Sequence, residues 1–397
     1  MFDVTPECLV VADRGLFVTI SAEGGAVPAR DARSGPARDR AASGKSRVRG
    51  AGRVPERAAV RRSGDAGAPR SGDGTRRSGA AVPAPVDELV LGPVPILARV
   101  VGVLLVLAAL TAVAGLIPIY LVVGGSRISL APGFGSVLIA LLAPVASLVV
   151  GVSLVGGRVP KFGLAYAAVS AALALGQLLI ELYRGSSSTT RPGVEVIAGQ
   201  RVLTSSVDVG AGWILGVVAL GLTVLAGACA AAAWGRVVME DGGSLDPARS
   251  GLAGAAVLLG VGTVLCLSLP PADVPDRVVT DPSTGMETVV TQEGPQALLE
   301  RPGLALLGGL LLAGAVVLCS VVAPSLRPRL ATVGGLLALA VTVLAAGLTG
   351  WRDAVTSSEL DWTVPGAGLV VAGLAYAVLT VLAWRVRRTR GGPPADE

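Results

Sequence analysis

The chain has 397 residues, of which 52% are hydrophobic and only 15% are charged, and its formal net charge is +5. Soluble domains carry about 25% charged residues, so this composition, with a mean hydropathy of +0.69, excludes an ordinary soluble protein. The abundance of Arg, Ala, Gly and Val, with little Lys, is typical of proteins from GC-rich bacteria.

Residues 1–85 form a basic tail without apolar periodicity. The tail holds 14 Arg and one Lys against nine acidic residues, interspersed with Gly, Ala, Ser and Pro. Such a segment cannot bury enough apolar surface to offset the entropy lost on ordering, so we predict that it is disordered. Two other interpretations stay open: a polybasic strip on anionic inner-leaflet lipid, and an extension of the reading frame that is not part of the native product. Residues 391–397 are predicted to form a second disordered tail.

Eight apolar stretches follow the basic tail, each close to the roughly 20 residues that cross a hydrocarbon core about 30 Å thick. One such stretch can be a buried helix of a soluble protein, but eight together predict a polytopic membrane protein. The expected fold class is an all-α membrane protein, a bundle of about eight transmembrane helices within residues 86–390. The spans are expected at about 95–123, 135–156, 162–183, 211–235, 251–270, 302–324, 329–350 and 365–385.

The five tryptophans fall at the predicted membrane edges, where an indole ring keeps its N–H hydrated. Trp213 and Trp234 are 21 residues apart, which is roughly 32 Å of helix at 1.5 Å per residue. Trp362 and Trp384 frame the last span in the same way, and Trp351 closes the seventh. We therefore interpret all five as interfacial anchors.

Basic and acidic loops alternate along the chain. The short loops after the second, fourth, sixth and eighth spans collect Lys and Arg, with Arg158, Arg236, Arg327 and Arg385 among their residues, whereas the other loops taken together carry more Asp and Glu than Arg. Lys and Arg accumulate in short cytoplasmic loops of membrane proteins. We therefore predict a multi-pass plasma-membrane protein with both its N-terminus and its C-terminus in the cytoplasm.

Two of the predicted outer loops contain β-hairpin signals. The β-favouring runs 277–280 and 287–291 flank a turn of Asp, Pro and Gly at 281–285. A looser signal joins 194–197 to 201–204. These segments are expected either to form hairpins that pair with each other as an external cap or to remain flexible loops.

Each half of the predicted bundle has four spans with a basic inner loop between its second and third. This pattern is what a tandem, parallel repeat would give. The string Gly-Leu-Ala-Tyr-Ala at 163–167 and again at 373–377 does not follow that symmetry, since the two copies would run in opposite directions. The repeat is therefore a hypothesis, and the repeated string is attributed to composition.

Motifs for catalysis or cofactor binding are absent. The chain has no His, the commonest metal ligand, and its four Cys form no C-x-x-C pair. The phosphate-binding motif G-x-x-x-x-G-K-[ST] and the hydrolase motif G-x-S-x-G do not occur. We predict that the protein is not an enzyme, has no cofactor, metal or catalytic residue, and has no nucleic-acid partner.

One polar pair lies inside a predicted span. Gln177 and Glu181 are four residues apart and share one face of the third helix. An ionisable group at membrane depth is a candidate functional residue, so the pair predicts a possible polar pocket wall. The alternative is an interfacial carboxylate whose head stays hydrated, because Glu181 is close to the predicted end of the span.

The leading functional hypothesis is a non-enzymatic scaffold or subunit of a membrane complex. Its partners would be the lipid bilayer and another membrane or extracytoplasmic protein. The alternative is a small-molecule or lipid permease without proton coupling. A membrane-embedded transferase is the third hypothesis, for which Asp208, Asp353 and Asp361 are the acids available at a membrane face.

Overall fold

A computed structural model describes residues 90–91, 94–187, 194–203, 206–240, 246–280, 282–283, 285–290, 295–357 and 359–385. The predicted disordered tails, 1–85 and 391–397, lie outside the described residues, as does Cys8.

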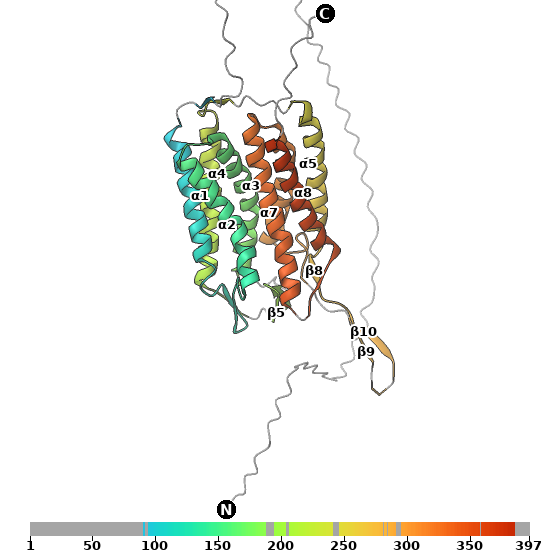
Figure 1. The fold of residues 1–397 in the computed structure, drawn as a ribbon. Helices are drawn as coiled ribbons and strands as arrows, with labels where there is room; N and C mark the ends of the chain where they lie inside the picture. Colours follow the sequence, from blue (N-terminus) through green and yellow to red (C-terminus); the bar gives the residue numbers. More distant parts are fainter. Residues whose placement is uncertain are drawn as a thin grey trace, which may run out of the picture. The chain divides into compact units, whose positions relative to one another are not determined.

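Eight helices form the bundle (Figure 1), and each is long and apolar enough to cross a membrane. The chain is therefore an all-α, multi-pass membrane protein, as the sequence predicts. The helices are α1 (Ile96–Ala114), α2 (Phe134–Val155), α3 (Pro160–Arg184), α4 (Ala211–Trp234), α5 (Asp246–Leu267), α6 (Leu304–Val322), α7 (Arg329–Thr356) and α8 (Val364–Arg385).

Two helices end differently from the prediction. The first span was expected to run to residue 123, but α1 ends at Ala114, where the Gly115 N–H caps the helix on the Thr111 carbonyl. Pro118 has no N–H with which to continue a helix, and the last apolar residues of the run form a strand. The seventh helix continues past the predicted end at 350 to Thr356 and carries two charged residues into the bundle.

The packing of the helices repeats between the two halves of the chain. In the N-terminal half, α1 packs on α2 and α4, and α3 packs on α4; in the C-terminal half, α5 packs on α6 and α8, and α7 packs on α8. The halves meet where α3 contacts α6 and α7 and where α7 contacts α2. Figure 1 shows α3 and α7 in the middle of the bundle. These two helices are also the most buried, because each packs on both halves.

The strands between the helices follow the same repeat. β2 (Leu121–Val123), in the α1–α2 loop, pairs with β6 (Val207–Val209), in the α3–α4 loop. β8 (Ala272–Asp273) and β11 (Asp361–Trp362) form the corresponding pair of the C-terminal half. β1 (Val90–Leu91) and β7 (Met239–Glu240), which precede the equivalent helices α1 and α5, pair with each other. The helix contacts and strand pairs of the two halves thus follow the pattern that a tandem four-helix repeat would give.

Both predicted hairpins form. β9 (Arg277–Thr280) pairs with β10 (Glu287–Val290), and β4 (Val194–Ile197) pairs with β5 (Gln200–Leu203) around a tight turn at Ala198 and Gly199. Both turn residues have positive φ, which suits the twist of a two-residue hairpin.

The expectation that the two hairpins pair with each other is wrong, since within the described strands they belong to separate sheets. β4 and β5 bury Ile197 and Val202 against β2 and against β3 (Ser126–Ile128), the third strand of the β2–β6 sheet. The β9–β10 hairpin instead projects from the bundle (Figure 1). Its Val278 and Val289 are each 60% exposed.

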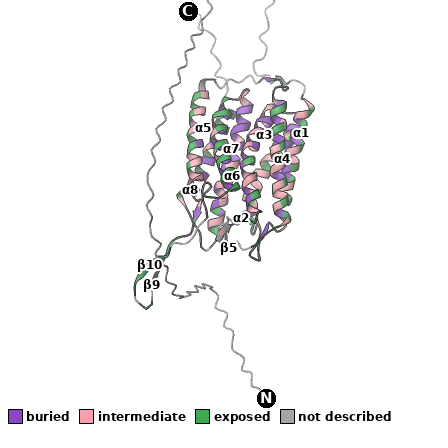
Figure 2. Cartoon of the chain, turned by 180° about the vertical axis from the view of Figure 1, so that it is seen from behind, coloured by how far each residue is buried: buried purple, intermediate pink, exposed green. Residues whose placement is uncertain are grey.

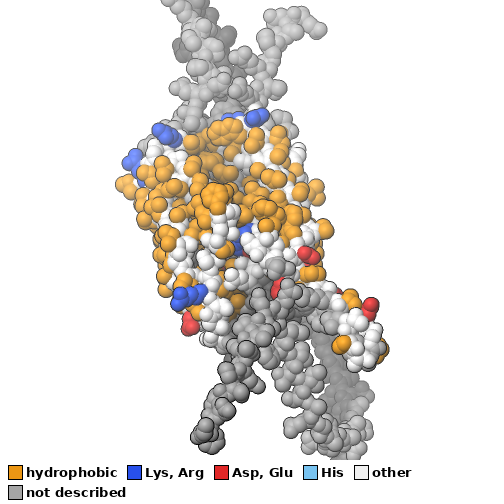
Figure 3. All heavy atoms as spheres, turned by 60° about the horizontal axis from the view of Figure 1, so that its bottom comes forward, with side chains coloured by type: hydrophobic (Ala, Val, Ile, Leu, Met, Phe, Trp, Pro, Cys, Tyr) orange, Lys and Arg blue, Asp and Glu red, His pale blue; other side chains and the backbone are white. Residues whose placement is uncertain are grey.

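We name the two ends of the bundle by their residues. The β end carries strands β2–β6 and β8–β11, and the basic end carries Arg158, Lys161, Arg236, Arg249, Arg327, Arg329 and Arg385. α1 begins and α8 ends at the basic end. Figure 3 shows its Lys and Arg side chains along the upper edge. All five Trp lie near helix ends, three at the β end and two at the basic end.

Glycines bring the helix backbones together. A Cβ added at Gly151 of α2 would lie 2.8 Å from the Gly102 carbonyl oxygen of α1, and one at Gly176 of α3 would lie 2.7 Å from the Gly308 carbonyl oxygen of α6. Small residues permit such close crossings, and in lipid van der Waals packing rather than hydrophobic burial drives the association.

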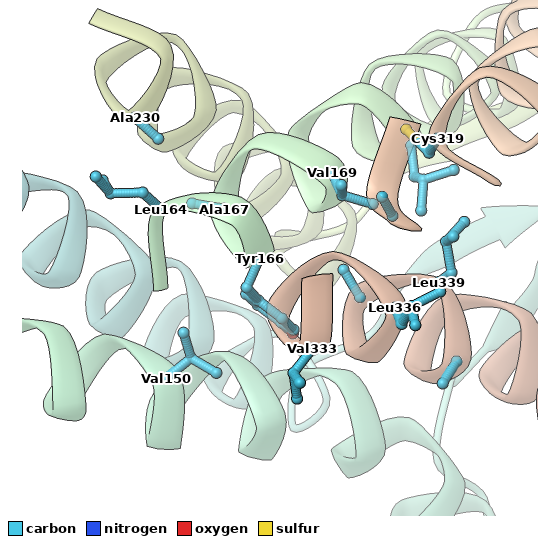
Figure 4. Packing of buried hydrophobic residues seen from close by; sticks show 14 of the residues in the cluster. Val150, Leu164, Tyr166, Ala167, Val169, Ala230, Cys319, Val333, Leu336 and Leu339 are labelled. Atoms are coloured by element: carbon cyan, nitrogen blue, oxygen red, sulfur yellow. The ribbon is translucent and has the colours of Figure 1, made fainter. Parts of the chain in front are cut away.

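Figure 2 shows buried residues toward the middle of the bundle and many exposed ones on its outside. Figure 4 shows side chains of α2, α3 and α7 converging around Tyr166.

Candidate functional site: an arginine-lined cavity

A cavity of about 580 Å³ lies between the helices of the N-terminal half and α7 of the C-terminal half. Its walls come mainly from α1, α2, α3, α4 and α7, and its volume falls in the range of about 300–1,000 Å³ typical of small-molecule sites. Space remains because many of the facing side chains are too short to fill it. These small residues include Ala108, Ala112, Ala140, Ala143, Ala174, Gly216 and Ala219.

Charged side chains line the cavity toward the β end. Three arginines contribute: Arg184 from the end of α3, Arg301 from the segment before α6, and Arg352 from the last turns of α7. The two lining carboxylates are Glu181 and Asp353. The lining residues thus carry one more positive than negative charge.

Glu181 is held by three neighbours. Arg184 donates from Nη1 to Glu181 Oε1 at 2.6 Å, the Tyr120 hydroxyl donates to Oε2, and Trp213 Nε1 donates to the Glu181 carbonyl oxygen at 2.9 Å. Burial, together with the negative charge of Glu181, raises the pKa of Tyr120 well above its usual value. The Tyr120 hydroxyl therefore stays protonated, as a donor to the carboxylate must.

Arg352 is fixed as firmly at the end of α7. Its Nε and Nη2 donate to Asp353 Oδ1 at 2.9 and 2.5 Å, and its Nη1 donates to the Leu130 carbonyl oxygen at 3.0 Å. The Arg352 side chain is 9% exposed. This pair ties α7 to the segment that leads into α2.

Arg301 has the weakest set of partners of the three arginines. Its Nη2 donates to the Gln296 carbonyl oxygen at 3.5 Å, and it forms no salt bridge with any residue in the described part of the chain. Burial and the nearby Arg184 lower its pKa to about 10, although Glu181, Glu195 and Tyr183 offset part of that shift. At neutral pH, Arg301 is therefore a charged guanidinium with most of its five N–H donors uncommitted.

The deeper part of the cavity carries neutral hydroxyl groups. Ser147 of α2 and Tyr166 of α3 share a hydrogen bond of 3.0 Å between their hydroxyl oxygens. Ser170, Thr223 and Thr342 also line this region. The cavity is thus charged at one end and apolar with a few hydroxyls at the other.

Both members of the predicted polar pair, Gln177 and Glu181, line the cavity. Of the three acids considered for a transferase, only Asp353 lines the cavity; Asp208 and Asp361 are exposed on β6 and β11.

The predicted tryptophan anchors differ in exposure. Trp213 donates a hydrogen bond to the Glu181 carbonyl oxygen, and Trp234 lies half-buried at the basic end. The other three, Trp351, Trp362 and Trp384, are 42–57% exposed.

Sequence reasoning missed Tyr120, Arg301 and Arg352 as site residues. All three fall in segments interpreted as loops or span ends, where charge is expected, and their convergence depends on contacts between distant segments. One available signal was the sequence Trp351-Arg352-Asp353, because a charged pair directly after a span is compatible with one more helical turn.

The cavity has the donors to hold an anion but no evident metal site. Within the described residues, no cluster of three or more His, Cys, Asp or Glu side chains could bind a metal ion, and Cys229, Cys266 and Cys319 are free thiols. The chain matches no protein-family model, and searches of curated proteins and of solved structures find no match to it.

Proposed function

We propose that the protein binds an organic anion in this cavity. The observation that carries the proposal is Arg301, a cation that lines the cavity without a salt bridge to any described residue. Arg301 is half-buried; a charge partly removed from water without a partner is costly, and a ligand carboxylate or phosphate would offset that cost. Arg301 would present its planar fork to such a group, with Arg184 and Arg352 adding positive potential.

This geometry favours the ligand-binding hypothesis, to which a permease belongs, over a purely structural scaffold. We also propose that the β end is extracytoplasmic and that both termini are cytoplasmic in the plasma membrane, since the basic end collects the Lys and Arg of the short loops. The charged end of the cavity would then lie toward the outer surface.

Ligand retention by the purified protein tests the proposal. Native mass spectrometry of protein extracted in mild detergent is expected to detect a bound anionic molecule in the wild type and to lose it in Arg301→Gln. Arg127→Gln is the matched control, because Arg127 is exposed on β3 at the same end and does not line the cavity. Equal retention by all three proteins would contradict the proposal.

The scaffold hypothesis also has one supporting observation. The β9–β10 hairpin exposes Val278, Met286 and Val289 by 60–67%, and a two-stranded hairpin offers edges to which a partner strand can pair. Proximity labelling on intact cells tests it: a partner that is captured by the wild type and lost in Val289→Lys would support a scaffold role. Labelling unchanged by this substitution would count against the hairpin as a docking element.

A further inference from the structure

The wall of the cavity formed by α2 differs from the others. Only 17% of the most apolar window of α2 is buried, against 61% for α3 and 67% for α7. Val150, Gly151 and Leu154 bury the part of α2 nearest the basic end. From Val137 to Val149 no residue of α2 is buried.

The contacts of α2 explain this distribution. It packs closely on α1 through the Gly102–Gly151 crossing, but only loosely on α3 and α7. The α2 residues that face the cavity have small side chains and are only half-buried: they are Ala140, Ala143 and Pro144. Across the cavity, α7 presents residues that are likewise half-buried, Thr342, Ala346 and Thr349. The gap between these two faces is thus lined by small side chains.

At the β end, packed chain covers part of the cavity. Ile197 and Ala198 of the β4–β5 hairpin line the cavity there. The hairpin sits close to α7, since a Cβ added at Gly199 would lie 3.2 Å from the Asp353 carbonyl oxygen. The hydrogen bond from Arg352 to the Leu130 carbonyl closes the same end next to α2. These contacts cover part of the cavity at this end, where the Arg184 side chain is 36% exposed.

We propose that the cavity opens laterally to the bilayer between α2 and α7, and that its ligand is an anionic amphiphile that enters from the lipid phase. This proposal rests on the proposed function and specifies its substrate class. The anionic head would contact Arg301, and the apolar chain would lie along the alanine face of α2.

The apolar lining supports an amphiphile over a small soluble anion. Leu220 and Leu312 line the cavity beyond its charged end, and apolar walls gain free energy by contact with a chain rather than with water. A carboxylate and a phosphate head are equivalent for the arginines, because both accept two hydrogen bonds from one guanidinium.

Binding of defined probes to the full-length protein tests the proposal. The probes are oleate and oleoyl-lysophosphatidate, with oleoyl-lysophosphatidylcholine as the matched zwitterion and acetate and inorganic phosphate as heads without a chain. Affinities are measured by ligand-dependent shifts of the melting temperature in detergent. The two anionic amphiphiles are expected to bind at least tenfold more tightly than the other three probes. Equal affinity of acetate or phosphate would overturn the amphiphile proposal in favour of a soluble anion.

Two substitutions on α2 separate the lateral opening from anion binding itself. Ala143→Phe places a ring in the cavity wall and is expected to weaken amphiphile binding about tenfold or more, whereas Val145→Phe, at a position that is 50% exposed, is the control and is expected to change it less than twofold. If Arg301→Gln weakens binding and Ala143→Phe does not, the lateral opening fails while the proposed function stands. If Arg301→Gln leaves every affinity unchanged, the proposed function itself fails.

A second measurement keeps the test decisive if Ala143→Phe does not fold. Ser147→Cys, in a background whose other Cys are replaced, places a thiol on the cavity face of α2. It is expected to react faster with a maleimide dissolved in the bilayer than with a charged, water-soluble one. The reverse order of rates would show that the cavity is reached from water and would overturn the lateral opening.

Discussion

Replacing Glu181 by Leu is expected to destabilise the protein. From the sequence alone, a desolvated carboxylate in a cavity would be a liability, and its removal would leave stability unchanged or improved. In the structure, Glu181 accepts hydrogen bonds from both Tyr120 and Arg184. Leu at this position would leave the buried Tyr120 hydroxyl without its acceptor and Arg184 without its closest carboxylate.

The magnitude follows from these two partners. An unsatisfied buried hydroxyl costs about 1–3 kcal/mol. Breaking a fully buried ion pair costs about 3–5 kcal/mol, but the Arg184 side chain is 36% exposed, so solvent and the cavity reduce that contribution to about 1 kcal/mol. The expected loss in the free energy of unfolding is therefore about 2–4 kcal/mol. Glu181→Gln, which keeps an acceptor for Tyr120, should lose about half as much.

Unfolding of the purified protein by titration with a denaturing detergent measures these differences, with helical circular dichroism as the signal. A double-mutant cycle with Tyr120→Phe isolates the Tyr120–Glu181 hydrogen bond. We expect the double variant to be more stable than the sum of the two single losses predicts, since neither orphaned partner remains. A Glu181→Leu protein as stable as the wild type would refute the reasoning and would favour a hydrated, interfacial carboxylate.

Three further predictions test the packing, the electrostatics and the topology. Gly151→Ala should lower the free energy of unfolding by about 1–2 kcal/mol, because its Cβ would lie 2.8 Å from the Gly102 carbonyl oxygen; Gly254→Ala, in open space on α5, should be neutral or stabilising. The pKa of Arg301 is lowered to about 10, so the affinity for oleate should stay constant between pH 7 and 9 and should fall above pH 10, where Arg301 loses its proton. The Arg301→Gln substitution should remove this fall in affinity. In a Cys-free background, an impermeant maleimide added to intact cells should react with Ser187→Cys, Ser283→Cys and Ser357→Cys but not with Ser325→Cys. The opposite labelling pattern would show that the β end is cytoplasmic.

The helices were predictable because the bilayer imposes a length and a composition on each span. Hydropathy located all eight, and its main error lay at the end of the first span, where the Val-rich residues 121–123 suit a strand as well as a helix. A local apolar count cannot tell these apart. The pairing of β2 with β6 decides between them, and it involves residues more than 80 positions away.

The cavity could be predicted only in part. Gln177 and Glu181 stood out because a polar pair inside an apolar helix is locally visible. Arg301 and Arg352 did not, since an arginine at a span end is ordinary and becomes unusual only when a third segment buries it. The positions of charged residues in the sequence thus indicate topology. They do not predict that Arg352 pairs with Asp353 while Arg301 donates to a carbonyl oxygen, because those contacts depend on tertiary packing.

The duplication of the fold does not extend to the cavity. In the C-terminal half, the fully buried Tyr376 of α8 hydrogen-bonds to Ser320 of α6 and to the Ala256 carbonyl of α5, at 2.7 and 3.2 Å, so its ring fills the space among these helices. In the N-terminal half, α4 corresponds to α8 and contributes Gly212, Gly216, Ala219, Leu220 and Thr223 to the cavity wall.

Tyr376 is thus enclosed among α5, α6 and α8, whereas the cavity borders α4, the helix that corresponds to α8. The C-terminal half also takes part in the site, because α7 belongs to it and carries Arg352 and Asp353 to the cavity. Within the N-terminal half, α2 is the least buried helix and has the fewest contacts with other helices, so it is the helix of that half with the least packing to break on moving. On this argument the two four-helix units contribute differently to the site. The C-terminal unit supplies charged residues at one end of the cavity, and the N-terminal unit forms most of the cavity wall, including the helix beside the proposed entrance.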